Sequence, residues 1–406
     1  MTNNKDSFYG LGIAPKILDI LERINFKVPT PIQLKAIPLG IEGKDIIGVA
    51  QTGTGKTHSF AIPIIQRLLQ IKGKALILAP TRELALQINE AFQGLAQPFA
   101  IKTACLIGGA PMYNQVQALR KNPRVVTATP GRLLDHMKQW NIMLDDVSIL
   151  VLDEADRMLD MGFAPQIEQI FRFLPKIRQT MLFSATIPKE IMEIASKYMK
   201  LPVSVEIAPS GTTAELVTQE LFIVRKEFKL RLLGKILEQF HGSVLLFSRT
   251  KHNACKIARS IRDMGYSASE IHSNRSLAQR CQALEGFKSG RYKVLVATDI
   301  AARGIDVSGI ELVVNFDLPD DAQNYVHRIG RTARAGHKGH AISFATPDQA
   351  SDVRDIEKII RRVLPISKHP EIATEKFSLA PVEAKNMISR HKSYHKPNRQ
   401  NRRFRK

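Results

Sequence analysis

Short runs of Val, Ile and Leu recur along this chain, and stretches with helical periodicity separate them. The runs are apolar throughout rather than at alternate positions, which is typical of strands buried on both faces of a parallel sheet. The first group reads DIIGVA, KALILAP, TACLIGG, RVVTATP, VSILVLD and QTMLFSAT, and the second reads QELFIV, GSVLLFS, SASEIHS, KVLVATD, LVVNFD and HAISFAT. The pattern predicts an α/β protein with two parallel sheets, each covered by helices.

The two groups of runs divide the 406 residues into two domains of similar size. Small, turn-forming residues in APSGTTAE separate the groups and indicate a linker. We therefore predict a first domain over residues 1–207, a linker over 208–215, a second domain over 216–370 and a tail over 371–406. From Ala384 to Lys406 the tail carries nine Lys or Arg and no acid, a composition typical of a disordered, solvated segment.

Charge and cysteine content narrow the class of protein. Lys and Arg outnumber acids 59 to 38, which predicts attraction to a polyanion such as nucleic acid. No apolar run approaches the roughly 20 residues that span a bilayer, and MTNNKDSFYG has no apolar signal core, so we expect a cytoplasmic protein with no membrane partner. Cys105, Cys255 and Cys281 match no metal or redox spacing and are interpreted as reduced thiols.

The segment AQTGTGKT, Ala50 to Thr57, follows the strand-like DIIGVA and precedes a helical stretch. Closely spaced glycines let backbone N–H groups point at phosphates, and a lysine can reach the β and γ oxygens. Gly53, Gly55 and Lys56 meet these needs, and Thr57 offers a hydroxyl to Mg²⁺. A GKT tripeptide alone is a weak signal, but between a strand and a helix it predicts nucleotide binding rather than an ordinary turn.

A phosphate loop requires a carboxylate for the metal, normally at the end of a neighbouring strand. VSILVLDEAD supplies Asp153, which would bind Mg²⁺ directly or through water, and Glu154, which could orient or deprotonate the attacking water. Two adjacent acids alone are commonly a helix N-terminus favoured by the macrodipole. Together with AQTGTGKT, they indicate a catalytic pair.

The segment FKVPTPIQ, Phe26 to Gln33, allows two interpretations. Thr30 as N-cap, Pro31 at the first helical position and Gln33 closing a capping box describe a helix start that needs no ligand. Gln33 could equally present its amide to a planar base. A glutamine amide pairs bidentately with the N6 donor and N7 acceptor of adenine, so the two interpretations are compatible.

Together, these motifs resemble those of the DEAD-box RNA helicases, ATP-dependent enzymes built from two RecA-like domains, and the resemblance runs from Phe8 to about Pro365. Within the family the sequence is most similar to the short bacterial RhlE-like group. The matching motifs are DEAD at 153–156, PTREL at 80–84, GG at 108–109, TPGR at 129–132, SAT at 184–186, FSRT at 247–250, ATD at 297–299, RGID at 303–306 and HRIGRTAR at 327–334.

The resemblance assigns roles to individual residues. Gln33 would read adenine, Phe8 and Phe26 would contact or brace the base, and Asp306 would contact the ribose. The implied ATP site comprises Phe8, Phe26, Gln33, Gln51, Thr52, Gly53, Thr54, Gly55, Lys56, Thr57, Gly304 and Asp306. The implied catalytic set comprises Lys56, Asp153, Glu154, His327, Arg331 and Arg334, with the last two arginines as fingers from the second domain.

The resemblance also implies an RNA site whose contacts go to phosphate and ribose and therefore carry little sequence information. Its residues would be Pro80, Thr81, Arg82, Gly109, Thr129, Gly131, Arg132, Arg249, Arg275, Thr298 and Asp299, assisted by the basic tail. Ser184 and Thr186 would couple domain closure to the ATP site. Isolated, HRIGRTARAG could be a solvated basic face, but beside a complete ATP site it indicates catalysis.

Four positions depart from the family pattern: Asn25 and Ala333 replace glycines, His58 replaces a small residue, and Leu277 replaces a glutamine. Asparagine tolerates the left-handed conformation. Leu277 removes one polar contact between domains, so we expect Arg280 to find another partner.

The resulting prediction is a monomeric RNA-dependent ATPase that separates short duplexes locally, with ATP and Mg²⁺ as cofactors. An ATP-timed RNA clamp and a DNA translocase are the alternatives. The resemblance suggests ribosome-assembly or RNA-decay proteins as partners.

Overall fold

The structure, a computed structural model, describes residues 7–50, 53–207, 217–302, 307, 309–332 and 339–378. The linker predicted at 208–215 lies outside the described residues, as does the tail from residue 379 onward. Within the described part of the chain, no helix is long and apolar enough to cross a membrane.

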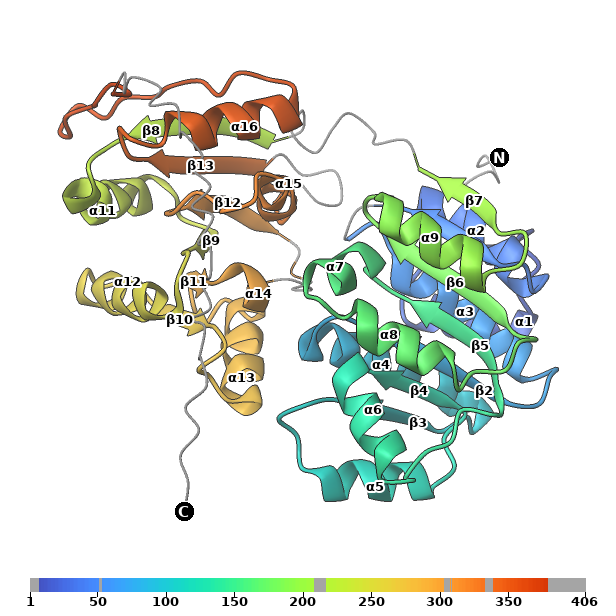
Figure 1. Cartoon of the computed structure of the whole chain (residues 1–406). Coiled ribbons are helices and arrows are strands. Elements are labelled where there is room, and N and C mark those ends of the chain that lie inside the picture. Colours follow the sequence, from blue (N-terminus) through green and yellow to red (C-terminus); the bar gives the residue numbers. More distant parts are fainter. Residues whose placement is uncertain are drawn as a thin grey trace, which may run out of the picture.

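The described chain forms two separate sheets whose strand pairs are all parallel (Figure 1). The first sheet has seven strands in the order β3-β4-β2-β5-β6-β1-β7. Its strands are β1 (Ile46–Val49), β2 (Lys74–Leu78), β3 (Thr103–Leu106), β4 (Val125–Ala128), β5 (Val147–Leu152), β6 (Gln179–Ser184) and β7 (Val203–Glu206). Six of these strands lie within the apolar runs expected from sequence, and β7 adds an edge strand.

The second sheet has six strands in the order β10-β11-β9-β12-β13-β8, again all parallel. Its strands are β8 (Val217–Ile223), β9 (Ser243–Phe247), β10 (Ala268–Ile271), β11 (Val294–Ala297), β12 (Ile310–Asn315) and β13 (Gly339–Ala345). Each strand contains residues from one predicted run. The prediction of two α/β domains with parallel sheets is confirmed.

Helices cover both faces of the first sheet, as expected for strands that are apolar on both sides. One core lies beneath α1 to α4, and the second lies beneath α6 to α9. The helices are α1 (Pro15–Arg23), α2 (Pro31–Ile41), α3 (Lys56–Leu68), α4 (Arg82–Ala96), α5 (Met112–Arg120), α6 (Pro130–Lys138), α7 (Ala155–Asp160), α8 (Ala164–Phe171) and α9 (Lys189–Tyr198), with a 3-10 helix at Gln97–Phe99.

The second sheet is covered in the same way. Its cores lie beneath α13, α15 and α16 on one face and beneath α11 and α12 on the other. The helices are α11 (Lys229–Gln239), α12 (Lys251–Asp263), α13 (Leu277–Lys288), α14 (Asp299–Ala302), α15 (Gln323–Ile329) and α16 (Ala350–Ile360), with a 3-10 helix at Lys226–Phe228.

The second domain extends beyond residue 370, where the sequence analysis ended it. Ile372 is only 7% exposed, and Phe377 packs against the domain core. Glu375 donates its backbone N–H to the Ile223 carbonyl at 3.0 Å and pairs with Arg225 at 2.8 Å. Residues 371–378 therefore belong to the folded surface, and starting the tail at 371 was wrong. The charge run from 384 onward dominated that prediction, whereas the preceding segment has apolar anchors.

Candidate functional site

The loop between β1 and α3 lies at the carboxyl end of β1, which lies between β6 and β7, and this end of the strands is where parallel sheets commonly bind ligands. Gly53 and Gly55 have φ values of 86° and 88°, in the left-handed region that favours glycine. A Cβ on Gly55 would lie 2.4 Å from Gln33 Nε2, which would force a shift. Both glycines are therefore needed for the turn, and Gly55 is also needed for the close approach of α2.

Lys56 opens α3 directly after this loop and is 5% exposed. Its Nζ has no hydrogen-bond partner within the part of the chain that the structure describes. A buried ammonium without a partner is strongly unfavourable, so this arrangement fits an anionic ligand that would complete it. Phosphate oxygens are the chemistry that a lysine after a glycine loop accepts.

Asp153 and Glu154 follow β5, and both are almost completely buried. Burial raises the pKa of Asp153 to about 6. The positive charge of Lys56 lowers this pKa, and the negative charge of Glu154 raises it. Burial would also raise the pKa of Glu154, but the charges on Arg157, Lys56 and Arg331 outweigh it and hold this pKa at about 2. Glu154 is therefore an ionised carboxylate that faces cations from both domains.

The backbone geometry of Glu154 is unusual. It precedes α7 with φ 51° and ψ 52°, a left-handed conformation rare for a residue with a Cβ. Such outliers concentrate at functional sites, where the surrounding structure holds them. The Asp153 carboxylate accepts the Glu154 backbone N–H at 3.0 Å, which helps to fix this turn.

Two residues of this site were not assigned a role from sequence. Arg157 donates to Glu154 Oε2 at 2.7 Å, and both side chains are buried. Asp156 Oδ2 accepts the Thr186 backbone N–H at 2.9 Å and its hydroxyl at 3.0 Å, and the Asp156 N–H donates to Ser184 Oγ at 3.3 Å. The i,i+3 spacing of Glu154 and Arg157 on one helix start was the available signal for the first pair.

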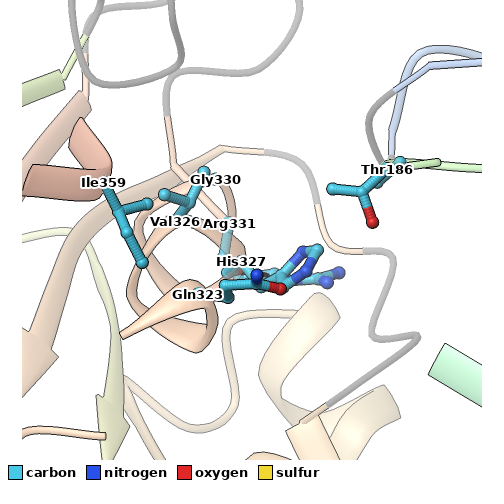
Figure 2. A pocket seen from close by; sticks show the side chains of 8 residues that line it. Thr186, Gln323, Val326, His327, Gly330, Arg331 and Ile359 are labelled. Atoms are coloured by element: carbon cyan, nitrogen blue, oxygen red, sulfur yellow. Dashed lines mark hydrogen bonds between the residues drawn. The ribbon is translucent and has the colours of Figure 1, made fainter. Parts of the chain in front are cut away.

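The second domain supplies His327 and Arg331 to the same region. Arg331 is 2% exposed and donates from Nε to the His327 carbonyl at 3.2 Å. Figure 2 shows both side chains pointing toward the side on which Thr186 lies. These residues line a cavity of about 310 Å³ together with Gln323 and Ile359. The structure therefore brings SAT and HRIGR residues to one cavity between the domains.

His327 is neutral at physiological pH in this environment. Burial lowers its pKa to about 4, and the positive charges of Arg157 and Arg331 act in the same direction against Asp156 and Glu154. A neutral imidazole can both donate and accept a hydrogen bond. This suits a residue between the two domains better than a third cation would.

Gln33 joins α2 to the phosphate loop. It is fully buried, its Oε1 accepts the Thr30 N–H at 2.9 Å, and its Nε2 donates to the Gly55 carbonyl at 2.9 Å. α2 begins at Pro31 as expected, and Asn25 takes a left-handed φ of 58°. One half of the predicted capping box is therefore formed, and the same amide lies against the loop that would hold a nucleotide.

The predicted RNA residues of the first domain follow the carboxyl ends of β2, β3 and β4. Arg82 opens α4 beside Gly109, where a Cβ would lie 2.4 Å from the Arg82 guanidinium. Thr81 caps α4 by accepting the Leu84 N–H at 3.2 Å, and Arg132 Nη1 donates to the Ala110 carbonyl at 3.1 Å. Of the remaining residues of this set, Pro80 lies between β2 and α4, Thr129 is the N-cap residue of α6, and Gly131 lies in the first turn of α6.

The predicted RNA residues of the second domain follow the ends of β9, β10 and β11. Arg249 Nε pairs with Asp320 at 3.2 Å. The Thr298 backbone N–H donates to the Ile271 carbonyl at 3.3 Å. Asp299 forms a two-pronged pair with buried Arg328, at 2.6 and 2.7 Å. Asp299 therefore also holds a buried arginine within the second domain, a role that was not predicted from sequence.

Arg275 donates to Glu270, which also pairs with Arg262 at 3.1 Å. Cys255 and His272 lie beside this carboxylate, and the three ligand-type atoms are within 4.8 Å of one another. Because two guanidinium groups already neutralise Glu270, a cation would be repelled from this cluster.

One buried ion pair joins the two domains. Arg280 of α13 donates from Nη2 to Glu83 Oε2 of α4 at 2.7 Å, and the two side chains are 11% and 1% exposed. Leu277, one turn earlier on α13, packs against the apolar core of the first domain. Arg280 thus has an acidic partner in the first domain, and Leu277 contributes an apolar contact to the same interface.

Several predicted site residues lie outside the described residues, so the structure says nothing of their contacts. They are Gln51, Thr52, Gly304, Asp306 and Arg334. The substituted Ala333 lies outside as well.

Comparison with known proteins adds sequence relatives. The family described as DEAD/DEAH box helicase matches residues 30–194, and the helicase conserved C-terminal domain matches residues 228–336. ATP-dependent RNA helicase CshA of Listeria monocytogenes is 42% identical over 389 residues, covering 93% of this chain and 75% of that protein. ATP-dependent rRNA helicase RRP3 of Debaryomyces hansenii is 40% identical over 371 residues, covering 90% of this chain and 78% of that protein.

Solved structures similar to this chain include RNA-bound complexes of Dbp5 and Mss116p. Saccharomyces cerevisiae Dbp5 bound to RNA and ADP BeF3 superposes with a TM-score of 0.78 and 31% identity, covering 89% of this chain and 95% of that chain. Mss116p bound to ssRNA and AMP-PNP superposes with a TM-score of 0.80 and 29% identity, covering 88% of this chain and 78% of that chain. Both likenesses extend across the two sheets.

Proposed function

This chain belongs to the DEAD-box family of ATP-dependent RNA helicases, which are RNA-dependent ATPases, and from that premise we propose how its own residues perform the reaction. One observation carries the proposal. The buried Lys56 ammonium lacks a hydrogen-bond partner in the described chain and lies close enough to Asp153 and Glu154 to lower the pKa of both carboxyl groups. Arg331, from the second domain, also lowers the pKa of Glu154. Lys56 would bind the β- and γ-phosphates of ATP. Glu154 would orient or deprotonate the attacking water, and Arg331 would neutralise charge that develops on the γ-phosphate.

The carboxylate of Asp153 and the hydroxyl of Thr57 fit Mg²⁺. Both are oxygen ligands of the kind Mg²⁺ prefers, and buried acids beside a phosphate loop favour a bound cation. Asp153 and Thr57 would hold the ion, partly through water, and the ion would offset phosphate charge when bound.

RNA would cross both domains at the carboxyl ends of the strands. Arg82, Arg132 and Arg249 would contact the backbone, so binding would tolerate almost any sequence. Closing the domains on ATP and RNA would bend the strand and separate a short duplex locally. The Thr186 hydroxyl donates to the Asp156 carboxylate, and the Asp156 N–H donates to Ser184 Oγ, so these two hydrogen bonds would connect the movement to the carboxylates.

We keep three finer points as proposals. Membership in the RhlE-like group remains a prediction, because the relatives compared above are named CshA and RRP3. The RRP3 relatives are named rRNA helicases, which supports ribosomal RNA as a substrate class and ribosome-assembly proteins as partners, with RNA-decay proteins as the alternative. A cytoplasmic, monomeric enzyme with its first domain near 1–207 also stays a prediction.

The test is ATP hydrolysis by the purified chain with no nucleic acid, with single-stranded RNA and with single-stranded DNA, alongside unwinding of a short labelled RNA duplex. Stimulation by RNA together with unwinding supports the proposal. RNA-stimulated hydrolysis without unwinding would favour an ATP-timed clamp. Equal stimulation by DNA would favour a DNA translocase.

Replacing Gln33 with alanine should weaken ATP binding and narrow the preference for ATP over GTP. Loss of a bidentate contact with adenine corresponds to about 1–3 kcal/mol of discrimination, a value taken from base readout in nucleic acids. Melting temperature should also fall, because the Thr30 N–H and Gly55 carbonyl lose their partners. The measurement is inhibition or KM with both nucleotides, with exposed Gln93→Ala as the control. Lower stability with an unchanged ATP/GTP ratio would reduce Gln33 to a helix cap.

Truncation after Pro381 should weaken RNA binding and raise the RNA concentration for half-maximal ATPase, while maximal turnover stays near the full-length value. The removed segment carries nine cations interleaved with Tyr394 and Phe404, which can stack on unpaired bases. If every charge meets a single-stranded phosphate, the slope of log affinity against log salt falls by about 6, at roughly 0.7 per contact. Equal salt slopes for both proteins would mean that the tail only keeps the enzyme soluble.

A further inference from the structure

Three rings form a column beside the phosphate loop. Phe8 and Phe26 stack with centroids 5.4 Å apart, and Phe26 and His58 stack with centroids 4.4 Å apart and planes inclined by 29°. Phe8 is 3% exposed and belongs to the domain core, whereas Phe26 and His58 are half-buried. The column therefore runs from the core to the surface and ends at the imidazole of His58.

The outer end of the column lies in the first turn of α3, directly after the phosphate loop. His58 is in the first turn of α3, two residues after Lys56, whose ammonium lacks a partner in the described chain. Gln33 approaches the same turn by donating to the Gly55 carbonyl. A nucleotide with its phosphates at Lys56 and its base at Gln33 would therefore lie beside the turn that carries His58.

We propose that His58 is a nucleotide-contacting residue whose imidazole face packs against the purine ring, so that the base extends the column by one ring. The inference rests on the ATPase function proposed above. Phe26, stacked behind it, holds the imidazole flat and limits the rotamer entropy lost on binding. Aromatic stacking of this kind adds to simple area burial, and every base has a face that can accept it. His58 therefore contributes affinity for any purine ring, whereas Gln33 contributes the preference for adenine over guanine.

Nucleotide specificity distinguishes the proposed role of His58 from that of Gln33. His58→Ser removes the ring, and we expect the KM for ATP and the Kd for ADP to rise about 3- to 10-fold, as loss of one stacked ring implies. Turnover at saturating ATP and RNA should change by less than about 2-fold, because stacking on the base is the same in ground and transition states. The ATP/GTP ratio should remain that of the wild type. His58→Phe keeps a flat ring and should restore both constants, and exposed His241→Ser is the matched control.

Inorganic tripolyphosphate tests whether the contact is with the base. This ligand binds the phosphate loop but has no ring, so its inhibition constant should be equal in wild type and His58→Ser. The same comparison by NMR gives a direct signature: ADP should shift the His58 ring C–H signal upfield through the adenine ring current, and tripolyphosphate should not. The signal is assigned by its loss in His58→Ser.

Two results would overturn the proposal. One is an unchanged Kd for ADP in His58→Ser. The other is equal weakening of ADP and tripolyphosphate, which would make His58 only a support for the loop. Both are distinguishable from failure of the proposed function, which would appear as a wild-type enzyme without RNA-stimulated hydrolysis.

Discussion

Replacing Glu154 with glutamine is expected to reduce ATP turnover by about 10²-fold or more while ATP and RNA still bind. Glu154 has a pKa of about 2 because Arg157, Lys56 and Arg331 outweigh its burial, so the wild-type side chain is an anion that can accept a hydrogen bond from the attacking water and orient it. Glutamine has the same shape and its oxygen can still accept the Arg157 hydrogen bond, which is 2.7 Å long in the wild type. It cannot take up a proton.

Single-turnover hydrolysis with saturating RNA measures this effect, and equilibrium binding of ATP and RNA to the same preparation shows that the site remains intact. Glu90→Gln is the matched control, because Glu90 is exposed on α4, away from the carboxylate pair. Wild-type turnover in Glu154→Gln would mean that Glu154 takes no part in hydrolysis. Catalysis would then come from positioning of the substrate by Lys56 and the second domain.

The strands and the phosphate loop could be predicted because their signals are local. Each buried strand is an uninterrupted apolar run, and the parallel order then brings the loop after β1 and the carboxylates after β5 to one edge. The helix start at Thr30 and Pro31 was likewise contained in four residues. Such features need no knowledge of distant parts of the chain.

Contacts between distant segments could not be predicted in this way. Glu83 and Arg280 are 197 residues apart in sequence, and no local sequence pattern indicates that they form a pair. The resemblance marked Leu277 as unusual, and only the structure showed it against the first-domain core. Asp299 was expected to contact RNA, whereas its carboxylate already holds Arg328, so any RNA contact there must share or replace that pair.

Replacing Arg331 with alanine is expected to lower kcat by about 10³-fold with little change in ATP affinity, because a finger acts on charge that develops only in the transition state. Arg331 is buried, donates to the His327 carbonyl, and lowers the pKa of Glu154 from across the domain interface. Arg331→Lys keeps the charge but loses the planar fork, so its turnover should fall between those of the wild type and the alanine variant.

A neighbouring arginine provides the sharpest contrast. Arg328 lies three residues earlier and is also buried, yet it donates to Asp299, Asn315 Oδ1 and the Asp317 carbonyl within its own domain. Arg328→Ala should therefore lower the melting temperature of the second domain, since Asp299 and the other acceptors lose their donor. Arg331→Ala should lower the melting temperature less than Arg328→Ala does, yet fail in hydrolysis. Arg259→Ala, on the exposed surface of α12, should change neither property. Wild-type turnover in Arg331→Ala would mean that the second domain serves RNA alone, and equal destabilisation of both variants would mean that Arg331, like Arg328, only holds its domain together.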